Sequence, residues 1–151
     1  MELKDILLVL HIAAAGTWLG ANIVQAVAPP LAAKQSPQAA AGWYRVAAGL
    51  SSRLYVPVGI LVAVTGIWMV LISDTFGFGN IFVGIGFAVV VIGALLGKFV
   101  FEPGSERAAA AIEAGDSGAI KAAAGRIAVF GTIDTLLLLL AITVMVLKLG
   151  A

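Results

Sequence analysis

The chain contains no cysteine and only one histidine, His11. The absence of cysteine excludes disulfide bonds and thiolate metal sites. A tetrahedral zinc site is disfavoured as well, because there is no second histidine to complete it. A metal or cofactor site in this protein would therefore be built around one imidazole and neutral ligands.

Charged residues are also scarce: they make up 11% of the 151 residues, and the formal net charge is +1. This balance argues against nucleic-acid binding, which needs a strongly basic surface. There is no phosphate-binding glycine loop ending in Lys and Ser or Thr. Serines that could serve a Ser-His-Asp hydrolase lie far from His11, so we do not expect that chemistry either.

What the chain has in excess is apolar sequence: 62% of its residues are hydrophobic, and the mean hydropathy is +1.10. A helix needs about 20 apolar residues to cross the hydrocarbon core of a bilayer. Four stretches meet this requirement, namely residues 6–28, 54–72, 81–101 and 127–147. We predict an all-α protein with a single integral membrane domain (1–151), folded as a four-helix transmembrane antiparallel bundle that contacts the lipid bilayer.

The two long connections, between the first and second and between the third and fourth spans, carry helix signals of their own. Pro29-Pro30 predicts the end of the first helix, and Pro103-Gly104 predicts the end of the third. After these breaks the alanine-rich segments predict short elbow helices on the cytoplasmic side. Their predicted boundary residues are Ser36 as N-cap, Pro37 at the first helical position, Gly115 as helix end, and Asp116 or Ser117 as the next cap.

The distribution of basic residues predicts the orientation of the chain. The two long connections carry most of them: Lys34, Arg45, Arg53, Lys98, Arg107, Lys121 and Arg126. Short basic connections are retained in the cytoplasm. We therefore expect a multi-pass protein of the plasma membrane with both termini outside.

The polar residues of the first span share one helix face. His11, Trp18, Asn22 and Gln25 recur at helical spacing, so they are predicted to face the bundle interior. At 1.5 Å per residue, His11 lies roughly 8 Å below the outer boundary. An ionisable group at that depth is a candidate functional residue.

Two methionines reach a similar depth from other helices. Met69 lies about 5 Å and Met145 about 3 Å from the outer ends of their spans. Histidine and methionine form the axial pair of some haem proteins, so His11 with Met69 or Met145 predicts a haem b site, with Trp18 and Trp68 as aromatic walls. The alternative cofactor is copper, since His11 with both methionines would suit the softness of Cu(I). The alternative is that His11 forms a hydrogen bond with another helix and the methionines fill the core.

Asp134 is the other outlier, about 10 Å inside the cytoplasmic boundary by helix rise. An unpaired carboxylate there would cost several kcal/mol. One interpretation is a structural ion pair with Arg53 or Lys98, whose long side chains could reach inward. The other is a proton-relay carboxylate, which would make Asp134 a candidate catalytic residue.

The segment "LHIAAAGTWLG" resembles the first-helix pattern of small bacterial membrane proteins related to the copper resistance D domain and to the membrane-type protoporphyrinogen oxidase. In that pattern a histidine is followed seven residues later by Trp and then by Gly. The resemblance covers about fifteen residues. It implies a haem b ligand at His11, a functional lysine at Lys98, and a bacterial inner membrane location.

Three hypotheses follow, and whether the protein is an enzyme is left open. In the first, it binds haem b through His11 and takes part in redox or tetrapyrrole chemistry. In the second, it is a small permease or a copper-handling protein whose path follows Trp18, Asn22 and Gln25 toward Asp134. In the third, it is an accessory subunit of a larger membrane complex, or a homodimer, in which His11 only packs.

Overall fold

The computed structural model describes residues 2–150 and is helical apart from short connections. Its elements in chain order are α1 (Leu3–Gln35), α2 (Pro37–Leu50), the π-helical η1 (Ser51–Tyr55), α3 (Val56–Leu71), α4 (Ile81–Leu96), the π-helical η2 (Gly97–Phe101), α5 (Glu102–Ala114) and α6 (Ser117–Leu147). The segments α2, η1 and α3 form one continuous helix, and so do α4, η2 and α5. The described chain therefore consists of four long helices, which confirms the all-α four-helix architecture.

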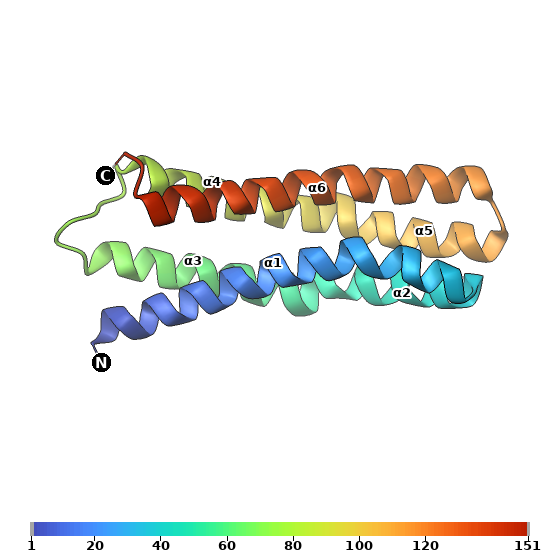
Figure 1. Ribbon diagram of the computed structural model, residues 1–151, viewed down its shortest axis with the longest axis horizontal. Helices are drawn as coiled ribbons and strands as arrows, with labels where there is room; N and C mark the ends of the chain where they lie inside the picture. The colour runs from blue at the N-terminus through green and yellow to red at the C-terminus, as the bar shows by residue number, and fades with distance from the viewer. Residues whose placement is uncertain (1, 151) are drawn as a thin grey trace.

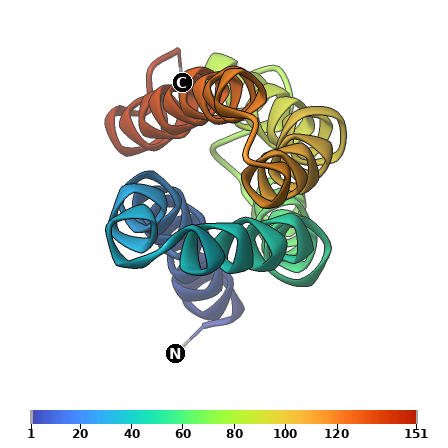
Figure 2. The same ribbon diagram turned by 90° about the vertical axis from the view of Figure 1, so that its right-hand side faces the viewer.

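The four long helices form an antiparallel bundle (Figure 1). Viewed from one end, they surround a common axis in chain order, with the fourth helix back beside the first (Figure 2). Both termini and the connection 72–80 lie at one end, here called the termini end. The two tight connections, at Ser36 and at Gly115-Asp116, lie at the other, here called the turn end.

All four helices are long and apolar enough to cross a membrane. They contain 31 to 35 residues each, which corresponds to about 50 Å at 1.5 Å per residue, whereas the hydrocarbon core is about 30 Å thick. The most apolar sequence lies toward the termini end. The helices are therefore longer than a hydrocarbon core requires, and at the turn end they continue as straight extensions of the bundle, not as separate short elbow helices.

The predicted breaks at Pro29-Pro30 and at Pro103-Gly104 were wrong. Helix α1 continues through both of its prolines to Gln35, although Pro29 and Pro30 cannot donate to the carbonyls four residues earlier. Such breaks are tolerated where neighbouring helices hold the chain in place. At Pro103 the helix also continues, because a wider π turn comes before the proline.

The two π turns occur at equivalent places in the two interrupted helices. The N–H of Val56 donates to the carbonyl of Ser51, and the N–H of Glu102 donates to the carbonyl of Gly97. In each case a proline is the next residue, Pro57 or Pro103. A proline ring in an α-helix clashes with the carbonyl four residues earlier. The wider turn relieves that clash and keeps both helices continuous, and π turns of this kind are frequent at functional sites.

The helix caps and the helix end predicted at Ser36, Gly115 and Asp116 were confirmed. Ser36 caps α2, its hydroxyl accepting from the N–H of Ala39 at 3.0 Å. Gly115 ends α5 with a left-handed φ of 67°, and Asp116 caps α6 by accepting from the N–H of Ala119 at 2.9 Å. Between these caps, α2 and α5 pack closely through small buried residues, which include Ala40, Ala41, Ala47, Ala108, Ala109 and Ala111.

Candidate functional site

The imidazole of His11 contacts α3. Its Nδ1 lies 3.0 Å from the hydroxyl of Thr65, and its Cε1 would lie 3.2 Å from a Cβ atom placed on Gly66. Thr65 is buried, and its hydroxyl lies 2.6 Å from the carbonyl of Leu61. A hydroxyl has one proton, and when Thr65 donates it to the carbonyl of Leu61, the Nδ1–H of His11 donates to Thr65. In this tautomer Nε2 keeps its lone pair and is the atom able to bind a metal.

A cavity of about 30 Å³ lies beside His11 in the bundle interior. Met145 of α6 and Trp18 of α1 line it together with apolar residues of α3, α4 and α6. Of the two predicted methionine partners, the lining among the described residues includes Met145 and not Met69. Met145 also packs its methyl group against Gly86 of α4. The structure therefore brings one histidine and one thioether to the same small space.

This cavity does not fit a haem. Its volume corresponds to on the order of one or two water molecules, whereas a porphyrin is a macrocycle many times larger. Of the two predicted aromatic walls, Trp18 lines the cavity, with its indole N–H donating to Asp134. Trp68 does not line it and is 47% exposed.

Asp134 forms the centre of a second cluster, deeper in the bundle. The indole Nε1 of Trp18 donates to its Oδ2 at 3.1 Å, and the side-chain amide of Asn22 donates to the same oxygen at 2.8 Å. The hydroxyl of Tyr55, in η1, donates to Oδ1 of Asn22 at 2.9 Å. Gln25 lies next to that hydroxyl. The interior stripe predicted on the first span is thus engaged, through Trp18, Asn22 and Gln25, with α6 and η1.

The two basic residues predicted to pair with Asp134 lie elsewhere. Lys98 forms an ion pair with Glu102, with Nζ 3.2 Å from Oε2, and its side chain is 69% exposed. Arg53 is exposed and lies beside Gly49, so its predicted place in the polar interior was wrong. Within residues 2–150 no basic side chain is paired with Asp134.

Sequence reasoning missed Thr65 and Tyr55. Thr65 is the one hydroxyl residue within α3, so its position opposite His11 was open to prediction. Tyr55 gave no comparable signal, because it lies in the π-helical segment and its direction depends on that wider turn. Both residues hold polar side chains of α1 in fixed orientations.

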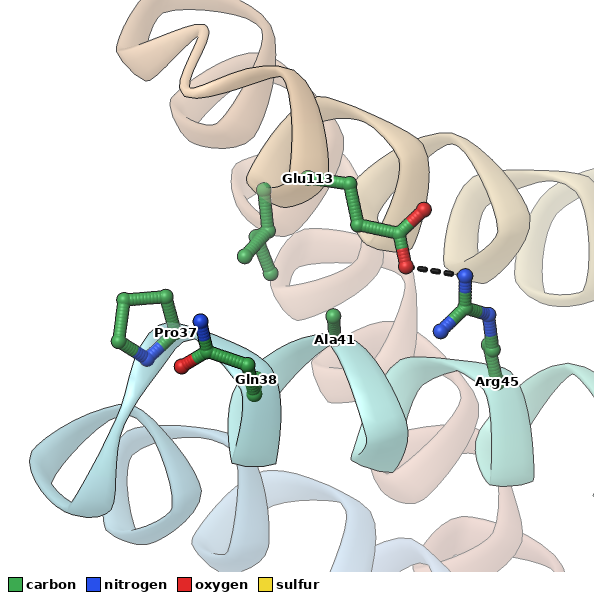
Figure 3. Close-up of a pocket in the computed structure, with 6 residues that line it drawn as sticks. Pro37, Gln38, Ala41, Arg45 and Glu113 are labelled. Atoms are coloured by element: carbon green, nitrogen blue, oxygen red, sulfur yellow. Dashed lines mark ion pairs between the residues drawn. The ribbon is translucent and has the colours of Figure 1, made fainter.

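A larger hollow of about 170 Å³ opens at the turn end, between α2 and α5 (Figure 3). Arg45 and Glu113 point toward each other across it and form an ion pair. Both side chains are largely exposed, at 62% and 45%, so the pair contributes little to stability. The hollow contains no group with evident chemistry beyond this pair.

Comparison of the chain with protein-family models, with curated proteins and with solved structures found no match. The resemblance to the copper resistance D group therefore stays a prediction. Among residues 2–150, no three His, Cys, Asp or Glu side chains are grouped to hold a metal ion. A metal at His11 would depend on Met145 as its second protein ligand.

Proposed function

We propose that the chain is a multi-pass membrane protein that binds copper(I) between His11 and Met145. The observation that carries this proposal is that both side chains line one small interior cavity. Imidazole nitrogen and thioether sulfur are neutral ligands, and soft thioether sulfur favours Cu(I). A monovalent ion also brings less charge into the apolar interior than a divalent ion would.

The hydrogen bond between His11 and Thr65 supports this proposal. Ligating histidines usually donate their other ring N–H to an oxygen, which fixes the tautomer and the direction of the ring. Here Nδ1 of His11 is held at 3.0 Å by Thr65, which leaves Nε2 as the ligand atom. Thr65 is itself held by the carbonyl of Leu61. The imidazole is thus oriented before any ion binds.

The row of polar residues in the bundle interior favours transport of copper through the bundle over permanent storage of the ion at one site. Polar residues continue from the cavity toward the turn end, with Trp18 between the cavity and Asp134. Asn22 and Tyr55 follow in the same direction. We propose that this interior path crosses a bacterial plasma membrane, with both termini outside and the basic turn end in the cytoplasm.

Haem b is the second candidate. An imidazole with Nδ1 held and Nε2 free is also the arrangement of a haem ligand. The cavity that His11 lines is too small for the macrocycle, so copper(I) is preferred.

The test is an anaerobic titration of the detergent-purified protein with copper(I) in competition with a coloured chelator. We expect tight binding that is lost in His11→Ala and weakened about tenfold or more, or about 1.4 kcal/mol, in Met145→Leu. The matched control is Met69→Leu, which should bind as the unaltered protein does. Absence of binding by the unaltered protein would overturn the proposal.

The same preparation separates the remaining hypotheses. A Soret band that disappears in His11→Ala would favour haem b over copper. Co-purification with a larger membrane complex, together with tolerance of His11→Ala, would favour an accessory subunit. A permease without a metal requirement predicts substrate flux in liposomes that depends on Asn22 and Asp134 but not on Met145.

A further inference from the structure

The two oxygens of the Asp134 carboxyl group have different surroundings. Both hydrogen-bond donors, Trp18 Nε1 and Asn22 Nδ2, point at Oδ2. Oδ1 is buried and, among the described residues, has no hydrogen-bond partner. The whole residue is only 2% exposed. A carboxylate with its charge spread over two oxygens would leave one of them without stabilisation.

Among residues 2–150, no basic side chain forms an ion pair with Asp134. From α1 it meets Trp18 and Asn22, which are neutral, and from α4 it meets Gly93, where a Cβ atom would lie 3.3 Å from Oδ1. The titratable group on its side of η1 is Tyr55, which reaches it through Asn22. The nearest basic side chains along the neighbouring helices, Arg53 and Lys98, are exposed, and Lys98 is paired with Glu102.

The neutral acid suits this environment better than the anion, even though its O–H on Oδ1 has no acceptor among the described residues. An ionised carboxylate without a partner cation costs several kcal/mol at membrane depth, because burying an uncompensated charge is far more costly than burying a neutral polar group. When the proton is on Oδ1, Oδ2 becomes a carbonyl oxygen able to accept two hydrogen bonds. Those two bonds are the ones present.

We propose that Asp134 is a proton-binding site inside the membrane that exchanges its proton with the turn end of the bundle. Uptake forms the O–H bond on Oδ1 from the carboxylate and a proton of hydronium, which becomes water. Release breaks that bond and returns the proton to water at the turn end. The site differs from the cavity at His11, although Trp18 touches both, and its protonation can be measured without copper.

The route to the turn end is marked by consecutive polar groups. Tyr55 donates to Asn22, which donates to Oδ2 of Asp134; these groups mark the polar side of the route and do not themselves carry the proton to Oδ1. Gln25 lies next to the Tyr55 hydroxyl, and one turn further Pro29 leaves the Gln25 carbonyl without its helical donor. Asp134 is about 10 Å from the turn-end boundary of its span by helix rise, so a few water molecules or side chains would complete the path.

The π-helical segments lie where this route leaves the membrane. Tyr55 is the last residue of η1, and η1 packs against η2. A Cβ atom on Gly97, in η2, would lie 3.1 Å from the hydroxyl of Ser51, in η1. A wide turn in each of two touching helices is a local irregularity through which water can reach the helix interior. Their position beside Tyr55 favours entry of the proton from the turn end.

The test is infrared spectroscopy of the full chain in lipid bilayers at neutral pH. We expect a carboxylic acid C=O stretching band that shifts in heavy water and is lost in Asp134→Asn. The matched control is Asp116→Asn, which replaces an exposed carboxylate with another good helix cap and should keep the band. Absence of the band from the unaltered protein would overturn the proposal, whether or not the variants fold. Persistence of the band in Asp134→Asn would overturn it as well.

The route of proton exchange is tested by the rate at which the carboxylic acid band of Asp134 shifts after transfer to heavy water. Tyr55→Phe removes the hydroxyl that donates to Asn22 and should slow the exchange. Tyr44→Phe is the matched control, since Tyr44 packs against Ala108 and Ala109 at the turn end, and it should leave the rate unchanged. Equal rates in the two variants would overturn the assigned route.

Discussion

The indole ring of Trp18 lies directly against the backbone of Gly93. A Cβ atom on Gly93 would lie only 2.6 Å from Cη2 of Trp18 and 3.3 Å from Oδ1 of Asp134. This close approach lets Trp18 reach across the bundle to donate to Asp134 on α6. Trp18 also meets Tyr55 edge to face, with ring centroids 6.3 Å apart. One glycine of α4 thus makes room for the contact that joins the cavity to the Asp134 cluster.

Gly93→Ala is therefore expected to destabilise the protein by about 1–3 kcal/mol, the usual cost of overpacking a core. The control is Gly84→Ala in the same helix, where nothing lies within 4 Å of the added methyl group. That change should be neutral or stabilising by about 0.5–1 kcal/mol, because alanine favours the helix. Unfolding in detergent, followed by circular dichroism, measures both. Equal stability of the two variants would show that Trp18 does not pack against Gly93.

Thr65→Val removes the hydrogen-bond partner of His11 Nδ1 while keeping nearly the same shape. We expect copper(I) affinity to fall about 10–100-fold, as is usual when the partner that orients a ligating histidine is lost. Thr143→Val is the control, since its exposed hydroxyl donates only to the carbonyl of Leu139. Competition titrations of the two variants decide the matter, and an unchanged affinity in Thr65→Val would mean that Thr65 does not position the imidazole.

Copper binding should release a proton if both proposals hold. The ion would add a positive charge to a cavity that Trp18 lines, and Trp18 donates to Asp134. Loss of the Asp134 proton would compensate that charge in the low-dielectric interior. We expect release of about one proton per copper ion, as is common when a metal binds, and none in Asp134→Asn. A pH-indicator dye in weakly buffered solution measures this, and equal release in both proteins would rule out the coupling.

The absence of cysteine from the sequence allows a clean test of orientation. Thr75→Cys places an exposed thiol in the connection at the termini end, and Ser117→Cys places one at the turn end. We expect a membrane-impermeant maleimide to label Thr75→Cys in intact cells and Ser117→Cys only after permeabilisation. The reverse pattern would place the basic turn end outside, contrary to the positive-inside rule.

The features that the sequence predicted well are those set by local chemistry. Four apolar stretches predict four helices, and Ser36, Gly115 and Asp116 end or begin helices through bonds within a few residues of themselves. Proline rules failed at Pro29 and Pro103 because packing and the π turns, which involve the whole bundle, override the local preference. The third helix therefore reaches Ala114.

The contacts of the candidate site were only partly predictable. Helical spacing correctly grouped Trp18 and Asn22 on one face of α1, but their partner Asp134 is more than a hundred residues away in sequence. Counting residues from the helix ends predicted that Met69 and Met145 lie at similar depths in the membrane. Which of them faces the cavity depends on how each helix is rotated about its axis, and in the structure Met145 faces it. An ion pair for Asp134 was a reasonable expectation, but the basic side chains at that level extend outward instead of inward.

X-ray absorption at the copper edge, on the protein loaded with copper(I), tests the central claim most directly. We predict a spectrum that contains imidazole nitrogen and thioether sulfur in the first coordination shell. The sulfur contribution should disappear in Met145→Leu and remain in Met69→Leu. A spectrum without sulfur in the unaltered protein, or one in which Met145→Leu changes nothing, would contradict the assignment of His11 and Met145 as a copper site.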